Sequence, residues 1–433
     1  MLKESPQSAI VIYPAVLSVA DASLRSSEGR LAEAVGLTEA IGLAVVFSEV
    51  IKVNNIKPST YIGQGNVERL SGIIASEDAS LVIMDCQLSP MQQRNLEKAW
   101  NCKVIDRTAL ILEIFGERAS TKEGVLQVEL AHLSYQKSRL VRSWTHLERQ
   151  RGGAGFLGGP GEKQIEMDRR IISDRISKIK KELEEVKRTR SLHRTARKRV
   201  PYPTIALVGY TNAGKSTLFN LLTHADVLAK DQLFATLDPT MRQLSLPNGS
   251  EVILSDTVGF ISELPTELVA AFRATLEEVL EADIILHVRD CCHADTEAQR
   301  QDVYKVLKSL GLEEKIEDNL LEVLNKVDLM EEEERKAMLT SAHRKEKIVA
   351  VSAKTGEGIP ELLHLLEIKL SETKLDLSVK LPIDDGAAIS WLYRRAEIVS
   401  RTDDDNFASF HVRMDKADVN RLQVMIEGKK KSE

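Results

Sequence analysis

Residues 209–216, near the middle of the chain, constrain its fold more than any other segment. They read G-x-x-x-x-G-K-S and join an apolar strand pattern at 204–208 to a helical pattern at 218–222. A glycine-rich loop in this setting surrounds phosphate oxygens with backbone N–H groups at the helix N-terminus. Its lysine bridges the β and γ phosphates, and its last hydroxyl ligates Mg²⁺. We therefore expect a mainly parallel, doubly wound sheet with a phosphate site at Gly209, Tyr210, Thr211, Asn212, Ala213, Gly214, Lys215 and Ser216.

Three more polar motifs follow in order, at the ends of the buried-strand patterns 252–255, 320–324 and 348–351. In the first, Asp256 reaches the Mg²⁺ shell directly or through water, and Gly259 offers its N–H to the γ-phosphate. In the second, Asp328 can accept hydrogen bonds from N1–H and the 2-amino group of guanine. Adenine presents neither donor and would leave the carboxylate unpaired. With an N–H from the third motif for guanine O6, the expected contacts include Asp256, Thr257, Val258, Gly259, Asn325, Lys326, Val327, Asp328, Ser352, Ala353 and Lys354.

Four motifs in this order are typical of P-loop GTPases, so we expect GTP as substrate, GDP as product and Mg²⁺ as cofactor. A threonine between the first two motifs should close over Mg²⁺ and the γ-phosphate. We favour Thr236 for this role, with Thr240 as the weaker alternative. The expected metal ligands are thus Ser216 and Thr236. The expected nucleotide contacts in this segment are Phe234, Ala235, Thr236, Leu237 and Asp238.

The residue after the D-x-x-G motif is Phe260, where Ras-like enzymes carry a glutamine that orients the attacking water. A phenyl ring cannot hydrogen-bond water, so intrinsic hydrolysis should be slow. Another group, a potassium ion or a partner would then position the water. Asp290 and Arg273 are polar candidates nearby in sequence, but both are better explained as structural. No catalytic residue is identified.

Two long helices are predicted ahead of these motifs. Apolar residues at 126–147 and at 165–186 recur every three, four or seven positions, which favours an antiparallel helical hairpin. Its tip, 151–162, is too glycine-rich to be helical and longer than a connection requires. The tip carries Arg151 and Phe156, which suit RNA, and a plain flexible connector is the alternative. A stripe without acidic residues, or else a solvated linker face, follows at Lys187, Arg188, Arg190, His193, Arg194, Arg197, Lys198 and Arg199.

The length of 433 residues alone suggests about three domains. We expect an α/β protein with an N-terminal α/β domain at 1–115, the hairpin and basic linker at 116–199, a P-loop GTPase domain at 200–372 and a small α+β domain at 373–433. In the first, strands at 9–13, 43–50, 81–85 and 104–105 alternate with helices at 28–41, 65–76, 89–100 and 106–116. Ser89 and Asp106 are the predicted N-caps of the last two helices. In the last domain we expect a helix at 387–399, a strand at 407–413 and a helix at 416–425.

Composition excludes several classes of protein. The formal charge of −6 means that nucleic-acid contact would come from a local patch. The four cysteines have no C-x-x-C spacing and the histidines no metal-binding spacing, so we expect no transition metal. No window approaches the roughly 18 apolar residues of a membrane span. A cytoplasmic location follows most simply, with peripheral membrane association left open.

Several segments resemble the HflX family of translational GTPases. They are RASTKEG at 118–124, LQVELA at 126–131, WTHLERQ at 144–150 and the glycine-rich tip to Glu162, together with 209–216, 234–240 and 256–260. The hairpin is the part most specific to this family. The resemblance extends from the N-terminal domain through the GTPase domain.

The resemblance implies a GTPase that binds the large (50S) ribosomal subunit through its N-terminal region. We expect a monomer when the protein is free. It also implies that the hairpin tip reaches toward ribosomal RNA. Members of the family split stalled or stress-inactivated 70S ribosomes, and we expect ribosome-stimulated hydrolysis. ATP use by the N-terminal part is also associated with the family, but this sequence has no second Walker motif. The alternative is a signalling-type GTPase switch that acts on a protein partner.

Overall fold

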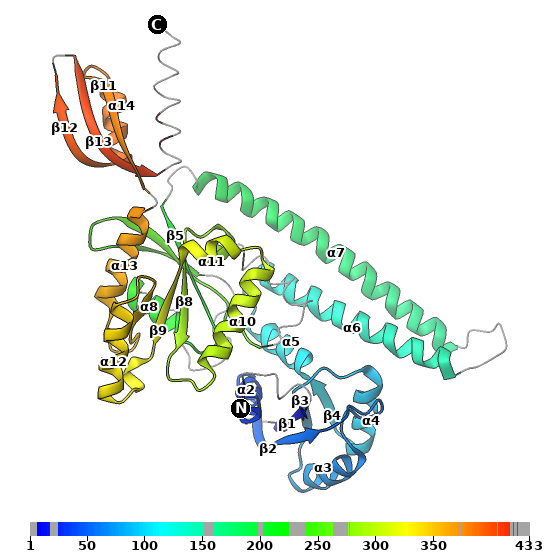
Figure 1. Ribbon diagram of the computed structural model, residues 1–433. Coiled ribbons are helices and arrows are strands. Elements are labelled where there is room, and N and C mark those ends of the chain that lie inside the picture. The colour runs from blue at the N-terminus through cyan, green and yellow to red at the C-terminus, as the bar shows by residue number, and fades with distance from the viewer. Residues whose placement is uncertain are drawn as a thin grey trace, which may run out of the picture. The chain divides into compact units, whose positions relative to one another are not determined.

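Figure 1 shows the computed structural model of the chain, with each helix and strand labelled. The chain divides into two compact units, Met1–Leu244 with Glu251–Gly358, and Ser245–Ser250 with Ile359–Glu433. None of the described helices is both long enough and apolar enough to cross a membrane. The structure describes residues 7–17, 25–150, 160–197, 202–224, 240–262, 276, 278–372, 374–404, 406–415, 419 and 422.

The first unit begins with a four-stranded parallel sheet in the order β2-β1-β3-β4. Parallel neighbours need crossover helices, and these bury both faces of the central strands. Both predicted N-caps are confirmed, because Ser89 accepts from Gln92 N and Asp106 from Ala109 N. The strands are β1 (Ser8–Val16), β2 (Ala44–Val53), β3 (Leu81–Met84) and β4 (Lys103–Asp106), and the helices are α2 (Ser27–Glu39), α3 (Gln64–Ser76), α4 (Pro90–Trp100) and α5 (Arg107–Arg118).

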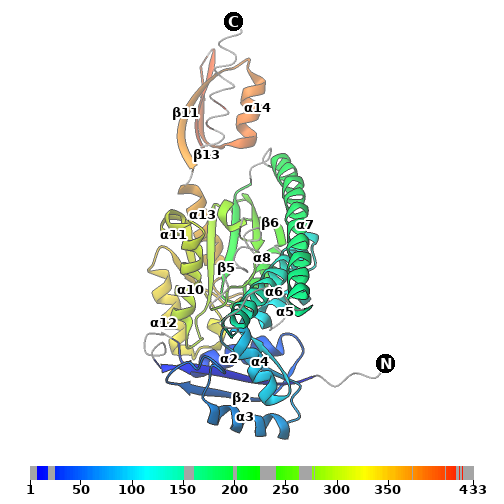
Figure 2. The ribbon, with the colours of Figure 1, turned by 90° about the vertical axis from the view of Figure 1, so that its right-hand side faces the viewer.

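Two long helices, α6 (Lys122–Gln150) and α7 (Pro160–Arg197), lie side by side in Figures 1 and 2, as the heptad spacing predicts. Leu126 packs against Ile179 and Leu183 between them. One expectation is wrong in detail. Residues 160–162 of the expected tip belong to α7, which starts at a proline whose missing N–H costs nothing there. The basic stripe, for which no secondary structure was predicted, is helical over 187–197, and 151–159 lie outside the described residues.

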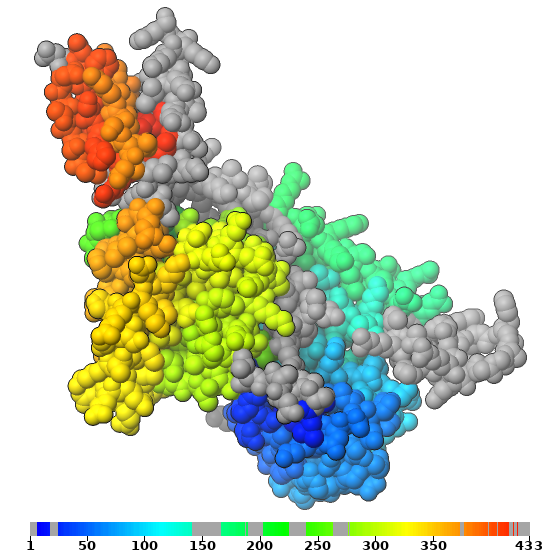
Figure 3. All heavy atoms as spheres, in the orientation of Figure 1, coloured from blue at the N-terminus to red at the C-terminus, as the bar shows by residue number. Residues whose placement is uncertain are grey.

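A six-stranded sheet in the order β10-β9-β8-β5-β7-β6 carries the nucleotide motifs. Its five strands from β10 to β7 pair in parallel, so their carboxyl ends meet at one edge. Figure 2 shows α8 and α10 on opposite faces, and Figure 3 shows side chains around α10 and α12 covering the near face. This doubly wound α/β sheet confirms the predicted fold class. Its elements are β5 (Thr204–Gly209), α8 (Lys215–Thr223), β6 (Thr240–Ser245), β7 (Glu251–Asp256), β8 (Ile284–Asp290), α10 (Thr296–Ser309), α11 (Glu313–Asn319), β9 (Leu320–Asn325), the 3₁₀ turn η1 (Val327–Leu329), α12 (Glu332–His343) and β10 (Ile348–Ala350).

The second unit holds helix α13 (Ile359–Glu372) and a three-stranded antiparallel sheet in the order β11-β13-β12. The predicted helix at 387–399 is too long, because α14 ends at Arg395. Ala396 is extended, and the β-branched Ile398 and Val399 that follow belong to a strand. Of the helix predicted at 416–425, only residues 419 and 422 are described, and both are helical. The elements are β11 (Lys374–Pro382), α14 (Gly386–Arg395), β12 (Glu397–Asp403) and β13 (Phe407–Asp415). The boundaries between the four expected domains stay predictions.

The turn after β10 makes a sharp stability prediction. Gly356 and Gly358 both have positive φ, +86° and +75°, so an alanine is strained at either position. At Gly358 a Cβ would also lie 2.1 Å from the Ala350 carbonyl oxygen, whereas at Gly356 it meets nothing within 4 Å.

We expect Gly356→Ala to lower the free energy of unfolding by about 1 kcal/mol. Gly358→Ala should lower it by about 3 kcal/mol or more, because the backbone has to shift as well. Urea unfolding followed by circular dichroism compares the two variants. Equal losses would show that the close approach to Ala350 is unimportant.

Candidate nucleotide-binding site

The phosphate loop connects β5 to α8 and requires glycine at both ends. At Gly209, φ is +152°, and a Cβ would lie 2.1 Å from the carbonyl oxygen of Val288 on the neighbouring strand. At Gly214, φ is +91°, and a Cβ would lie 2.2 Å from Asn325 Nδ2. Between them Asn212 adopts a left-handed conformation with φ of 59°. The backbone therefore packs directly against β8 and β9, and its curvature leaves the N-terminus of α8 at the carboxyl edge of the sheet.

The buried Lys215, at the first position of α8, is held by the loop itself. Its Nζ donates to the carbonyl oxygens of Gly209 at 3.1 Å and Tyr210 at 2.9 Å. Burial lowers the pKa of Lys215 to about 8, and the nearby charge of Asp256 only partly opposes this. A buried ammonium group that is short of negative charge is well suited to an anionic ligand.

Two oxygen donors meet beside Lys215. The Ser216 hydroxyl donates to Asp256 Oδ2 at 2.7 Å, which joins the start of α8 to the end of β7. A hydroxyl and a carboxylate are hard ligands of the kind that Mg²⁺ prefers. The buried Thr211 hydroxyl has no hydrogen-bond partner among the described residues, so a polar ligand could satisfy it. The donor set therefore fits a hydrated Mg²⁺ held together with phosphate oxygens.

Asn325, at the end of β9, connects three of the predicted motifs. Its Nδ2 donates to the carbonyl oxygen of Ala213 at 2.9 Å, and its Oδ1 accepts from Ala353 N at 2.9 Å. The side chain is buried, and its amide can satisfy an acceptor and a donor at the same time. Asn325 therefore fixes the phosphate loop relative to the turn at 352–354. The sequence predicted a nucleotide contact for Asn325 but not this structural role.

Two more residues of this motif, Asp328 and Lys326, are also held in place. Asp328 Oδ1 accepts from the Ser352 hydroxyl at 2.6 Å, which orients the carboxylate. Lys326 has φ of 71°, and its Nζ pairs with Asp290 Oδ2 at 2.8 Å. Asp290 thus has the structural role expected of it, at the end of β8.

The segment after Asp256 lies against the phosphate loop. The N–H of Phe260 donates to the Gly209 carbonyl at 3.0 Å, and its carbonyl accepts from Thr211 N at 2.8 Å. The phenyl ring is buried within the core, with 2% of the residue exposed. Phe260 therefore contributes to packing, and its side chain is shielded from solvent.

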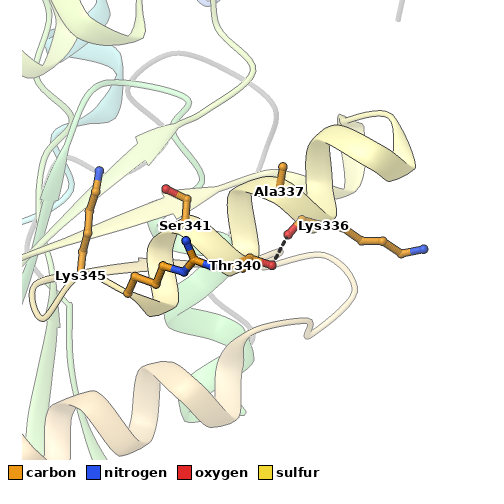
Figure 4. Close-up of a pocket in the computed structure, with 6 residues that line it drawn as sticks. Lys336, Ala337, Thr340, Ser341 and Lys345 are labelled. Carbon is orange, nitrogen blue, oxygen red and sulfur yellow. Dashed lines mark hydrogen bonds between the residues drawn. The ribbon is translucent and has the colours of Figure 1, made fainter.

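The structure brings together most of the predicted contacts, at the ends of β5, β7, β9 and β10. Phe234, Ala235, Thr236, Leu237, Asp238 and Arg273 lie outside the described residues. Thr240, the alternative to Thr236, begins β6. A separate surface hollow of about 480 Å³ on α12 contains none of the predicted contacts. Figure 4 shows its residues, Lys336, Ala337, Thr340, Ser341, Arg344 and Lys345.

Four family descriptions match successive parts of the chain. Residues 28–116 match "GTP-binding GTPase N-terminal", and 118–197 match "GTP-binding GTPase Middle Region". Residues 204–326 match "50S ribosome-binding GTPase", and 337–433 match "HflX C-terminal domain".

Curated relatives are similar over most of their length. GTPase HflX of Magnetococcus marinus is 49% identical over 397 residues, which are 92% of this chain and 90% of that protein. GTPase HflX of Escherichia coli is 44% identical over 366 residues, 84% of this chain and 85% of that protein. Among solved structures, the complex of SsGBP with GDP aligns with a TM-score of 0.47 and 24% identity, over 84% of this chain and 98% of that chain.

The double contact of Asn325 can be tested with one atom exchanged. In Asn325→Asp an oxygen replaces Nδ2 and faces the Ala213 carbonyl, while the bond from Ala353 N is kept. We expect a loss of about 1–3 kcal/mol in the free energy of unfolding and a loss of about tenfold or more in GDP affinity. Titration with a fluorescent GDP analogue measures the affinity.

Asn248→Asp is the matched control, because Asn248 is exposed and its Oδ1 accepts only from Ser250 N among the described contacts. The carboxylate preserves that bond, so nucleotide affinity should not change. Wild-type affinity in Asn325→Asp would contradict the role given to Asn325.

Proposed function

The chain belongs to the HflX family of GTPases, and we propose that it acts on ribosomes as a GTP-dependent splitting factor. Family membership makes the chain a GTP-binding protein that hydrolyses GTP. The observation that supports the nucleotide site best is that Asn325 joins three of the four motifs by hydrogen bonds. The binding roles of individual residues, the magnesium ion and the ribosomal step are parts of the proposal.

In the proposed site, the N–H groups at 211–216 and the Lys215 ammonium group bind the phosphates. The buried lysine gains the negative charge that its surroundings lack, which favours a triphosphate over a neutral ligand. Ser216 and Asp256 would hold Mg²⁺, which neutralises charge on the β and γ phosphates. Thr236 is proposed as a ligand beside Ser216, with Asp256 acting directly or through water. Gly259 donates its N–H to the γ-phosphate.

Guanine specificity is assigned to Asp328, whose carboxylate accepts from N1–H and the 2-amino group. The hydrogen bond from Ser352 to Oδ1 fixes the orientation of the carboxylate, and thereby also the position of Oδ2. We assign guanine O6 to a backbone N–H of the turn at 352–354, in which the N–H groups of Ser352 and Ala353 already donate to Glu357 O and Asn325 Oδ1. A positioned acceptor discriminates strongly, because a base without the donors leaves it unpaired.

Asp328→Asn should exchange the preferred base. The amide offers a donor where guanine also has a donor, whereas xanthine has a carbonyl oxygen at its 2-position. We expect GTP affinity to fall at least about tenfold and XTP affinity to exceed it, and competition titrations would measure both.

Asp318→Asn, an exposed change of the same kind on α11, is the control and should bind GTP as the wild type does. Loss of GTP binding without any gain of XTP would count against the assignment of Asp328.

The ribosomal part of the proposal is supported by the match of 204–326 to a 50S ribosome-binding GTPase and by the HflX relatives. The seam of the hairpin is used internally, since Leu126 packs on Ile179 and Leu183. This leaves the polar faces and the glycine-rich tip for a partner. We infer that the tip contacts ribosomal RNA of the large subunit and that binding splits stalled 70S ribosomes into subunits.

The buried Phe260 predicts that hydrolysis depends on a partner. We expect slow GTP turnover by the protein alone and a stimulation of about 10-fold or more by purified large subunits, because a partner has to supply the missing positioning of water. The stimulation should fall steeply with salt if RNA phosphates are contacted. Phosphate release measured at two salt concentrations tests both points.

Replacement of residues 152–161 by a short Gly-Ser turn is the companion variant. It should keep nucleotide affinity and lose ribosome stimulation. A salt-insensitive stimulation by a protein would favour the signalling alternative, and unchanged stimulation in the tip variant would place the contact elsewhere.

A further inference from the structure

A cluster of buried charges joins the N-terminal sheet to the nucleotide motifs. Its centre is Glu33 on α2, whose carboxylate pairs with Arg25 at 2.7 Å and with Arg107, the first residue of α5. Arg107 also donates to Asp85 at 2.6 Å. Burial alone would raise the pKa of Glu33, but the guanidinium groups of Arg107 and Arg25 lower it to about 2. Glu33 is therefore an anion at neutral pH, held by two cations.

Two residues from the nucleotide-binding region, Tyr210 and Ser262, form hydrogen bonds with Glu33 of this cluster. The hydroxyl of Tyr210, in the phosphate loop, donates to Glu33 Oε2 at 2.5 Å and accepts the N–H of Ser262 at 2.6 Å. The Ser262 hydroxyl donates to Glu33 Oε1 at 2.9 Å, and Arg107 donates to the Ser262 carbonyl at 3.1 Å. Glu33 thus fixes the loop and the segment after D-x-x-G to one another.

The segment from Gly259 to Ser262 is also closed tightly on the loop. Besides the two backbone bonds of Phe260, a Cβ built on Gly259 would lie 2.9 Å from Thr211 Cα and 3.1 Å from Lys215 Nζ. This side of Gly259 lacks room even for a methyl group. A γ-phosphate bound by both Gly259 and Lys215 therefore requires a shift of the Lys215 ammonium group or of this segment.

We propose that Glu33 is a positioning residue that holds the segment 259–262 closed and thereby sets the preference of the site for GDP over GTP. The inference rests on the proposed function, in which Gly259 binds the γ-phosphate. GDP has no γ-phosphate and leaves the segment in place. GTP pulls Ser262 away from Glu33 and Tyr210. By linkage, GTP then loosens the contact between the N-terminal sheet and the nucleotide motifs.

We call the contacts of Glu33 with Tyr210 and Ser262 the clamp. Two variants weaken it to different degrees. Glu33→Gln keeps the size of the side chain but removes the charge, and it leaves two guanidinium groups without their shared anion. Ser262→Ala removes one hydroxyl and keeps the ion pairs of Glu33, so it tests the proposal even if Glu33→Gln does not fold. Glu49→Gln is the matched control on the N-terminal sheet, because Glu49 pairs at 2.8 Å with the largely exposed Arg69.

The measurement is the ratio of dissociation constants for GMPPNP and GDP in the full-length protein, from competition with a fluorescent nucleotide. We expect both clamp variants to shift the ratio about fivefold or more toward GMPPNP, with GDP affinity unchanged and Glu49→Gln at the wild-type ratio. Changing both sites together should add little to the larger effect, because the two residues act through one contact.

An unchanged ratio in folded Ser262→Ala and Glu33→Gln would overturn the inference, as would a parallel loss of affinity for both nucleotides, which indicates a merely structural role. Wild-type protein that binds neither nucleotide would instead overturn the proposed function and this inference with it. GDP binding in every folded variant therefore separates the two failures.

Discussion

The carboxylate of Glu33 is almost fully buried between the two sheets, where Arg25 and Arg107 neutralise it and the hydroxyls of Tyr210 and Ser262 donate to it. The surrounding core is continuous, since Val11 and Ile83 of the first sheet belong to the same buried cluster as Val208 and Ile285 of the second. Charges in such an interior are costly unless they are paired and hydrogen-bonded. Hydrogen-bonded ion pairs are directional, so they fix how the two sheets pack on one another. Apolar contacts alone would specify this packing only weakly.

The candidate nucleotide site also depends on the packing of the second sheet. Parallel strands place their carboxyl ends at one edge, and Asn325 then connects the phosphate loop to the turn at 352–354. Close packing of Gly209 and Gly214 on the neighbouring strands removes the slack from the loop. The polar groups of the site are therefore held by the sheet before any ligand arrives, which lowers the ordering cost of binding.

Sequence reasoning could place the nucleotide motifs because each is local and its strand can be read from the same few residues. It could predict the N-terminal elements and both caps for the same reason. It missed Glu33, Arg107 and Ser262, because their contacts join residues 74 to 229 positions apart and no local pattern indicates them. The strand β12 was missed because Arg395 ends a helix that the apolar spacing would have continued, and propensity alone does not locate that end.

Phe260 connects the two halves of this architecture. Its backbone pairs with the phosphate loop, while its ring is buried in the core that the two sheets share. A glutamine there would leave an amide in an apolar setting, which is costly without a partner. We infer that Phe260 contributes to core packing, so that a displacement of the D-x-x-G segment also disturbs the core around the ring. An apolar residue at this position then favours coupling between nucleotide and N-terminal sheet, at the expense of unassisted hydrolysis.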